Sequence, residues 1–492
     1  NTCNERGRKL SKNKNKTDRE QKAGDKYYKS IFIGITLAGL IIRILLLGLP
    51  SRCFYPYDHL TNYGWWRHSI EYGLMEDYGY NRNDYHFIYG KAQTIEIKQA
   101  CYGPDGRLYK PGDIVTLPPG EYNARPIHYP PLAAYLIHMM GYIHLLSDST
   151  MEPLTFTAWF IMEFPVYISD FLIALGCMLT VSHFAGKKSG FITYILMWFC
   201  PGILLTGVLW GQWDSWFLAP CVWCVYFSLK EKWTLSGIIY GIAIMLKAQS
   251  LVMGPALAYF FLSKNNLRAT GIFTISAILT IMLIPLPFTI HSGFAWFHNC
   301  YVETFTEILP YSTLKAFNIW MIDLIICRNN DINSTIFGIT KKTSGLVLLI
   351  AGLIISFFIC YKKYKNNSIS LPALTALTFA VTFLFPTKVH ERYIIYFLPF
   401  LILSAFIENN YWVIFTGYSI IAIFEVTHHI WLHEAFNLQN AGFFTLMFLF
   451  LLSIAALFLF FHWIKTINGT YTELTKPKDN RINEKKQTIF RK

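Results

Sequence analysis

The stretch IFIGITLAGLIIRILLLGLP, residues 31–50, decides the class of fold. It is about as long as the ~20 residues that a helix needs to cross the hydrocarbon core of a bilayer. Thirty polar residues precede it, and it ends without the small residues of a signal-peptidase site. The pattern predicts an uncleaved membrane-spanning helix and not a signal peptide.

Eleven further apolar runs follow the first, so the sequence predicts an all-α polytopic membrane protein with about 12 transmembrane helices. Between the first two runs lies a long outer loop in which we expect interface helices. The further runs cover residues 156–181, 190–209, 216–229, 235–246, 251–262, 271–287, 345–360, 371–385, 393–406, 412–429 and 443–463.

The composition argues against an ordinary soluble protein. Of 492 residues, 53% are hydrophobic and 15% are charged, whereas soluble domains carry about 25% charged residues. The net charge of +13 lies mostly in the tails: residues 1–30 hold ten basic and four acidic side chains, and residues 465–492 hold eight and three. No base-reading motif accompanies these lysines, so we do not expect a nucleic-acid partner.

The position of the basic residues predicts the topology, because short basic segments stay on the cytoplasmic side. Both termini are expected there, together with four basic links between spans. We divide the chain into a basic tail (1–30), a catalytic transmembrane module (31–290) that includes the outer loop 51–155, a second outer loop (291–343), a C-terminal transmembrane module (344–464) and a second basic tail (465–492).

Two segments of the first outer loop have helical patterns. Residues 58–74 place apolar side chains at helical spacing with charges between them, which is typical of an interface helix. Residues 128–146 begin with Pro-Pro and continue apolar, and we interpret them as a second interface helix. If this segment instead crosses the membrane, every later link changes sides. Two pairs of cysteines, Cys53 with Cys101 and Cys300 with Cys327, are expected on the outer side and could form disulfides there.

Ionisable and other strongly polar side chains in or beside apolar runs are costly in a membrane, so each is a candidate functional residue. They occur at four places, all on the outer side of the predicted topology. These are Asp58 after the first span, Gln212 and Asp214 in WGQWDSW, Lys247 in MLKAQS, and Lys388, His390, Glu391 and Arg392 in PTKVHERY.

One carboxylate facing several cations suits the transfer of an activated sugar. The attacking group needs a base for its proton, and a departing phosphate needs positive groups. Asp58 is the candidate base. Arg392, Lys388 or Lys247 could hold the phosphate, the arginine as a bidentate fork and the lysines as point charges.

Several motifs resemble those of the GT-C superfamily of polytopic glycosyltransferases, which use lipid-phosphate sugars as donors. YPYDHLTNYGWW, residues 55–66, is similar to their first-loop pattern of an aspartate and a downstream tryptophan, here Asp58 and Trp65. HYPPLAAY, with Tyr129, resembles the Tyr-Pro-Pro-Leu segment of the dolichyl-phosphate-glucose glucosyltransferases of N-glycan precursor assembly. LKAQSLVMGPALAYF and KVHERYIIYFLPF resemble two further segments of those enzymes.

The chain departs from that pattern at three places. WGQWDSW replaces a His-x-x-Phe-Gln-Tyr-Asn turn, Arg392 stands where those glucosyltransferases have lysine, and AFNIW (residues 316–320) is closer to bacterial and protist relatives. These departures affect the identity of the sugar and the acceptor more than the type of reaction.

The resemblance implies a hexosyltransferase whose donor is a dolichyl or polyprenyl monophosphate sugar carrying glucose or mannose. Asp58 would be the catalytic base of an inverting transfer, with His390 and Arg392 near the donor phosphate. The acceptor would be a lipid-linked oligosaccharide, another glycan or a protein, on the lumenal or extracytoplasmic face. Tyr57 and His59 flank Asp58, so no Asp-x-Asp is present, and we expect neither a metal nor another cofactor. The membrane would be that of the endoplasmic reticulum in a eukaryote or the plasma membrane in a bacterium.

Alternatives stay open at each position. Asp58 could only cap the helix that follows it, and Asp214 could pair with a cation to hold its turn. Lys247 could extend outward to water from a helix end, and residues 390–392 could form a structural salt-bridge cluster.

The competing class of function is a transporter or flippase of a polyprenyl-linked or anionic solute.

Overall fold

A computed structural model describes residues 28–47, 56–78, 85–91, 93–96, 101–102, 108–117, 119–124, 126–303, 310–364, 370–407, 411–431 and 442–474. The chain forms two compact units, Asn1–Leu47 and Gly48–Lys492. In the first unit, Tyr28–Leu46 is an apolar helix long enough to cross a membrane. The predicted first span is thus helical over most of its length, and all other elements belong to the second unit.

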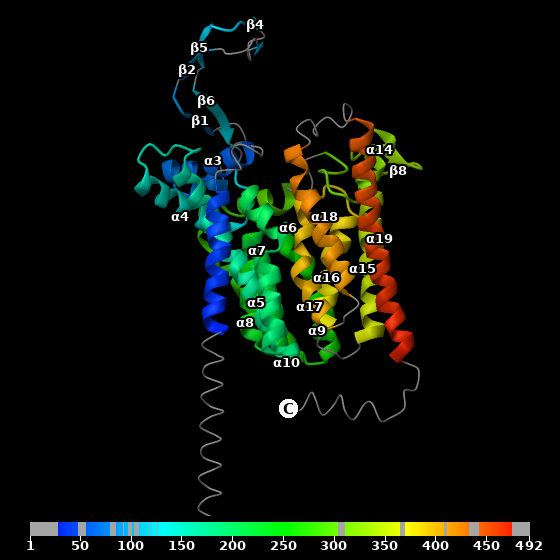
Figure 1. The fold of residues 1–492 in the computed structure, drawn as a ribbon. Helices are drawn as coiled ribbons and strands as arrows, with labels where there is room; N and C mark the ends of the chain where they lie inside the picture. Colours follow the sequence, from blue (N-terminus) through cyan, green and yellow to red (C-terminus); the bar gives the residue numbers. More distant parts are fainter. Residues whose placement is uncertain are drawn as a thin grey trace, which may run out of the picture. The chain divides into compact units, whose positions relative to one another are not determined.

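The second unit is mostly helical (Figure 1). All eleven further apolar runs that the sequence predicts coincide with helices. After the outer loop these are α5 (Phe156–Trp198), α6 (Pro201–Leu204), η2 (Leu205–Leu209), α7 (Ser215–Leu229), α8 (Trp233–Leu246), η3 (Ala248–Met253), α9 (Gly254–Lys264), α10 (Leu267–Leu283), α11 (Leu286–Ser292), α12 (Ala295–Phe297), η4 (His298–Glu303), α14 (Ile319–Cys327), α15 (Lys341–Tyr364), α16 (Ser370–Leu384), η5 (Glu391–Tyr396), α17 (Leu398–Ile407), α18 (Trp412–Trp431) and α19 (Phe443–Leu474).

Not all of these helices are long and apolar enough to span a bilayer as a single helix. Among the described residues, four helical segments of the whole chain are long and apolar enough, and the pair α10 and α11, bent by 45°, is a fifth candidate. The segment Phe156–Leu209 contains a break at Gly186 (φ 85°, ψ 163°), which lies between two predicted runs. The total of about 12 spans stays a prediction, as do the domain boundaries and the cytoplasmic position of both termini.

Two helices of the first outer loop pack against each other. They are α3 (Pro56–Tyr72) and α4 (Pro131–Ser147), and α4 begins with proline at its first helical position, as the sequence predicts. A Cβ added at Gly141 would lie 2.9 Å from the carbonyl oxygen of Trp66, so this glycine permits the close approach of the two helices. α4 also packs on α5 and α8. Whether α3 and α4 lie at a membrane interface stays a prediction.

Between these helices the chain forms a long antiparallel ribbon that the sequence analysis did not predict. β1 (Tyr85–Tyr89) pairs with β6 (Gly120–Ala124), β2 (Gln93–Glu96) with β5 (Ile114–Leu117), and β3 (Cys101–Tyr102) with β4 (Leu108–Tyr109). At its base the ring of Phe87 lies 5.2 Å from that of Tyr63 in α3. From this base the ribbon leads away from the helices of its unit (Figure 1).

The second outer loop contacts the turn before η5. The backbone N–H of Leu314 donates to Val389 O (3.1 Å), and that of Lys388 donates to Ser312 O (3.1 Å). Further along this loop a two-stranded hairpin joins β7 (Thr335–Ile336) and β8 (Ile339–Thr340). The two cysteines of this region are not paired with each other: Cys300 is buried, Cys327 is exposed, and both are free thiols. Cys53, of the other predicted pair, lies outside the residues that the structure describes.

Candidate functional site

Four segments that are distant in sequence meet beside the first turn of α3. Three of them are the predicted outer turns: the one before α7, the one between α8 and η3, and the one that leads into η5. They are brought together because α7 packs on α8, η3 contacts both, and α16 contacts η3 and η5. The fourth is residues 126–130, which lead into α4 and carry Tyr129.

Asp58 lies in the first turn of α3 and is partly buried. Its Oδ2 accepts hydrogen bonds from Gln212 Nε2 (2.8 Å) and from Trp210 Nε1 (3.3 Å). Both donors come from the turn before α7, so the Asp58 side chain contacts more than its own helix. Whether Asp58 is the base stays a prediction.

Asp214 holds two cations in a buried cluster. Its side chain is fully buried, and its Oδ1 accepts from Lys247 Nζ at 2.5 Å. Its Oδ2 lies 3.1 Å from Arg392 Nε, and the hydroxyl of Tyr396 also donates to Oδ1. Lys247 is 6% exposed, so it does not extend into water as one alternative suggested.

The charge state of this cluster follows from its contacts. Burial alone would raise the pKa of Asp214, but Lys247 and Arg392 outweigh burial and hold that pKa below its ordinary value. The carboxylate is therefore ionised at neutral pH. Among Asp214, Lys247 and Arg392 alone, two cations and one carboxylate leave one net positive charge in a largely dehydrated place, where an anion is held more strongly than in water. Asp58 and Glu391 lie outside this count.

His390 lies next to the arginine of this cluster. Arg392 Nη1 is 3.3 Å from His390 Nδ1, and Glu391 Oε2 is 3.6 Å from the same nitrogen. Burial, and then the charge of Arg392, lower the pKa of His390. A guanidinium can only donate, so in the tautomer that bonds to Arg392 the Nδ1 atom is the acceptor and Nε2 carries the proton. His390 thus offers one N–H donor beside the two cations.

Asp58 is close enough to His390 and Arg392 to interact with them electrostatically. The negative charge of Asp58 raises the pKa of His390 and of Arg392, although other effects are larger in both cases. The guanidinium carbon of Arg392 also lies 5.3 Å from the ring centroid of Trp210, which is the residue that donates to Asp58. The carboxylate from the first outer loop and the cations from the last turn therefore share one site.

Three aromatic side chains, Tyr129, Trp65 and Trp213, form an aromatic wall beside Lys247. The ring of Tyr129 is 5.5 Å from that of Trp65 and 5.9 Å from that of Trp213, and Lys247 Nζ lies 5.3 Å from the Tyr129 centroid. Faces of this kind can stack on a sugar ring or on a cation.

Of the predicted site residues, Lys388 is placed at the edge. Burial and the positive charge of the neighbouring Lys342 lower the pKa of Lys388, and its backbone N–H donates to Ser312. Asp58, Gln212, Asp214, Lys247, His390, Glu391, Arg392, Trp65 and Tyr129 belong to the network described above. The roles assigned to all ten residues stay predictions.

Sequence reasoning missed several aromatic and amide partners. Tyr396 donates to Asp214, and Gln249 Nε2 donates to the hydroxyl of Tyr393 (2.9 Å), whose ring stacks on that of Tyr396 at 4.7 Å. The two tyrosines are three residues apart in KVHERYIIYFLPF, a spacing that puts both on one face of a helix. The sequence signal that could have predicted these partners is the pair of tyrosines at helical spacing directly after the charged turn 388–392.

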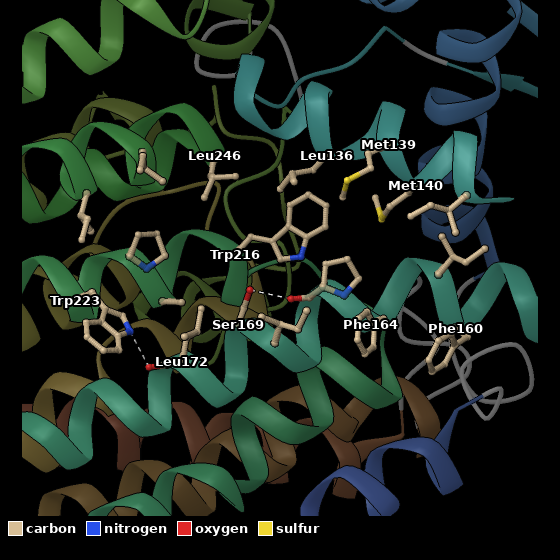
Figure 2. Close-up of a pocket in the computed structure, with 18 residues that line it drawn as sticks. Leu136, Met139, Met140, Phe160, Phe164, Ser169, Leu172, Trp216, Trp223 and Leu246 are labelled. Atoms are coloured by element: carbon tan, nitrogen blue, oxygen red, sulfur yellow. Dashed lines mark hydrogen bonds between the residues drawn. The ribbon is translucent and has the colours of Figure 1, made fainter. Parts of the chain in front are cut away.

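An apolar cavity of about 760 Å³ lies beside this site, between α4, α5, α7 and α8 (Figure 2). Trp216 connects the two, because it lines the cavity and stacks on Trp213 of the aromatic wall (4.5 Å, interplanar angle 5°). Leu246, the residue before Lys247, lines the cavity too. Met139 and Ile168 in the lining are 48% and 46% exposed, so the cavity opens on the apolar exterior.

The fold and the site together define a polytopic helical membrane protein with a carboxylate, a dehydrated pair of cations and a lipid-sized apolar cavity at one place. Residues 125–468 match the model of the ALG6, ALG8 glycosyltransferase family. The chain belongs to that family, which is part of the GT-C dolichyl-phosphate-glucose glucosyltransferase group, and it is a membrane glycosyltransferase. The resemblance derived from the motifs is thereby confirmed.

The match covers most of the site but not all of it. Gln212, Asp214, Lys247 and Arg392 lie inside the matched residues, whereas Asp58 and Trp65 lie before residue 125. No curated protein matches the chain. In the part of the chain that the structure describes, no three His, Cys, Asp or Glu side chains are grouped so that they could hold a metal ion.

Proposed function

We propose that this protein transfers glucose from a dolichyl-phosphate-glucose donor to a hydroxyl of a glycan acceptor, by inverting displacement at the lumenal face of the endoplasmic reticulum membrane. The family favours glucose over mannose, which the sequence left open, and it favours an enzyme over a transporter. The observation that carries the proposal is the meeting of Asp58 with the Asp214–Lys247–Arg392 cluster.

The charge of the cluster suits a monophosphate donor. A sugar linked through one phosphodiester carries one negative charge, and the cluster offers one net positive charge. Lys247 acts as a point charge and Arg392 as a planar donor. The N–H at His390 Nε2 adds a neutral donor. These groups stabilise the charge that grows on the phosphate as it departs.

The reaction is a single displacement at the anomeric carbon. The acceptor oxygen forms a bond to this carbon while its bond to the phosphate oxygen breaks, and the phosphate leaves with the electron pair. Asp58 takes the proton of the acceptor hydroxyl. Asp214 is occupied by both cations, so it is a poor candidate for a covalent nucleophile, and with Asp58 acting as the base a single displacement inverts the anomeric carbon.

Positive charge for the leaving group comes from side chains in this scheme. Lys247 and Arg392 supply the electrostatic stabilisation that a divalent cation supplies in other transferases. We therefore propose a metal-independent transfer, with a lipid-linked oligosaccharide as the acceptor that suits the family and the polytopic membrane fold.

The cavity suits the isoprenoid chain of the donor. It is lined by apolar side chains, it opens on the apolar exterior, and its inner end reaches the aromatic wall. Trp216 Nε1 is buried there and, among the described residues, has no hydrogen-bond partner, so it can donate to a polar atom at the head of the lipid. Leu246 leads directly to Lys247, where the phosphate would lie.

A transfer assay tests the proposed function. Purified protein in detergent is incubated with radiolabelled dolichyl-phosphate-glucose or dolichyl-phosphate-mannose and a lipid-linked oligosaccharide, each with and without EDTA. We expect labelled product from the glucose donor, with the β-donor giving an α-linkage, at the same rate in EDTA. Product from the mannose donor alone, loss of activity in EDTA or retention of configuration would each overturn the corresponding part of the proposal.

Filling the cavity should weaken binding of long-chain donors selectively. Ile242 lines the cavity, and Ile242→Trp should raise KM for the dolichyl donor about tenfold, because the larger side chain displaces about two buried CH₂ groups of the lipid chain, at ~0.8 kcal/mol each. KM for a short citronellyl-phosphate-glucose donor should change less than twofold. The matched control is Ile278→Trp on α10, where the side chain is 49% exposed and does not line the cavity. Equal effects on both donors would show that the lipid chain lies elsewhere.

A further inference from the structure

The turn Trp210–Gly211–Gln212 donates two hydrogen bonds to one oxygen of Asp58. Both side-chain donors of the turn reach Oδ2, at 2.8 Å from Gln212 and 3.3 Å from Trp210. In the part of the chain that the structure describes, no hydrogen bond reaches Oδ1. One carboxylate oxygen is therefore held and the other is available to a substrate.

The backbone fixes the position of the turn. It follows the π-helix η2: the Trp210 N–H donates to the fifth preceding residue, Leu205 O (3.1 Å), and the Gln212 N–H donates to the sixth, Thr206 O (3.1 Å). π-Helical turns are rare and occur frequently at functional sites. Here the widening carries both donor side chains toward α3.

Gly211 permits this approach, and no larger residue would. Its φ is +68°, in the left-handed region, and an added Cβ would lie 2.4 Å from His59 Cε1 and 3.0 Å from His59 Nε2. The imidazole cannot easily move aside. Its Nδ1 is 3.2 Å from Met162 Sδ, and its ring centroid is 3.7 Å from that of Trp159.

His59 supports the turn without adding charge. Burial lowers the pKa of His59 to about 3, so the ring beside Asp58 is neutral at every pH of interest. A charged imidazole here would compete with the cations of the donor site for the carboxylate.

We infer that the Trp210–Gly211–Gln212 turn is a positioning element for Asp58: it fixes the orientation of the carboxylate and favours its ionised form, and Gln212 does not bind the substrate. The inference rests on the proposed function, in which Asp58 is the base. Donors to an ionised carboxylate stabilise that form relative to the protonated one.

Removing one donor tests the inference through a pH profile. Gln212→Leu should lower kcat about tenfold and move the acidic limb of kcat/KM upward by about one pH unit, which matches a lost hydrogen bond to a charged group. KM for the donor and for the acceptor should stay within twofold. A substrate-binding role would instead raise KM and leave the acidic limb in place, and a purely structural role would lower the active fraction with the same pH profile.

The second variant acts on the backbone. Gly211→Ala should shift the acidic limb in the same direction, since the added Cβ displaces both donors from Asp58. The matched control is Gly352→Ala in α15, where an added Cβ would lie 2.8 Å from Val381 Cγ1 and no site residue is touched. It should leave the pH profile unchanged.

A readout without substrate separates this inference from the proposed function. Difference infrared titration against Asp58→Asn isolates the carboxylate band of Asp58, and in Gln212→Leu that band should titrate at higher pH than in the wild type. An unshifted band would overturn the inference even in an active enzyme. A shifted band in a protein without transfer activity would uphold the inference and overturn the proposed function.

Discussion

Asp58→Asn should lower the turnover of glucosyl transfer by about 10²- to 10⁴-fold, the contribution usually made by a positioned base. The amide keeps the shape of the carboxylate and can still accept from Gln212 Nε2 and Trp210 Nε1. We therefore expect an unchanged unfolding temperature and an unchanged Kd for the donor. The measurements are single-turnover rates with radiolabelled donor, and donor binding by isothermal titration in detergent.

The control for this substitution is a second aspartate of the same outer loop. Asp77 in η1 (Leu74–Tyr78) is buried and bonded to His68 Nδ1 at 3.1 Å. Burial raises the pKa of Asp77 to about 6, so its surroundings oppose the charge that Asp77→Asn removes. Asp77 has no contact with the Asp58 carboxylate among the described residues, so this variant should keep turnover within twofold of wild type. Wild-type turnover in Asp58→Asn would remove Asp58 from the mechanism.

Asp214→Ala should lower the free energy of unfolding by about 3–5 kcal/mol, the usual cost of removing one partner of a buried ion pair. Lys247 and Arg392 would both lose their counterion, at 2.5 Å and 3.1 Å. Donor binding should weaken as well, because the two cations would no longer be held in a fixed geometry. Denaturant titration in detergent micelles measures the first effect, and donor titration measures the second.

Two further variants separate the charge effect from simple loss of packing. Asp214→Ala combined with Lys247→Met should be more stable than Asp214→Ala alone, because one uncompensated cation is gone. Asp323 forms a similar pair with Lys341 (2.5 Å) outside the site, so Asp323→Ala should lose stability but keep kcat and KM. If Asp214→Ala and the wild type bind the donor with equal affinity, the cluster does not bind the donor phosphate.

Much of the site could be predicted because charge in an apolar sequence is conspicuous. Asp58, Asp214, Lys247 and Arg392 each interrupt or follow an apolar run, and the alternation of basic links put all of them on one side. The helical positions followed from the same runs. The structure adds that these residues meet, which no local pattern contains, because it depends on how α7, α8, η3 and η5 pack.

What could not be predicted depends on side-chain direction and on contacts far apart in sequence. Gln212 and Asp214 are two residues apart, and yet one bonds to Asp58 and the other to Lys247. Lys388 and Arg392 share a motif, but Lys388 lies beside Lys342. The ribbon of residues 85–124 was missed because its strands are short and stand among polar residues, although TIE and IVTL hold the β-branched residues that strands favour.

That ribbon has a consequence for how the family can vary. Its first and last residues, Tyr85 and Ala124, face each other across the pair β1–β6, so the chain departs from α3 and returns to α4 at nearly the same point. An excursion that closes on itself imposes no strain on its anchors, and its reach can grow or shrink without changing the spacing between Asp58 and Tyr129. The length of the ribbon between these two helices can therefore change without moving the side chains of the site.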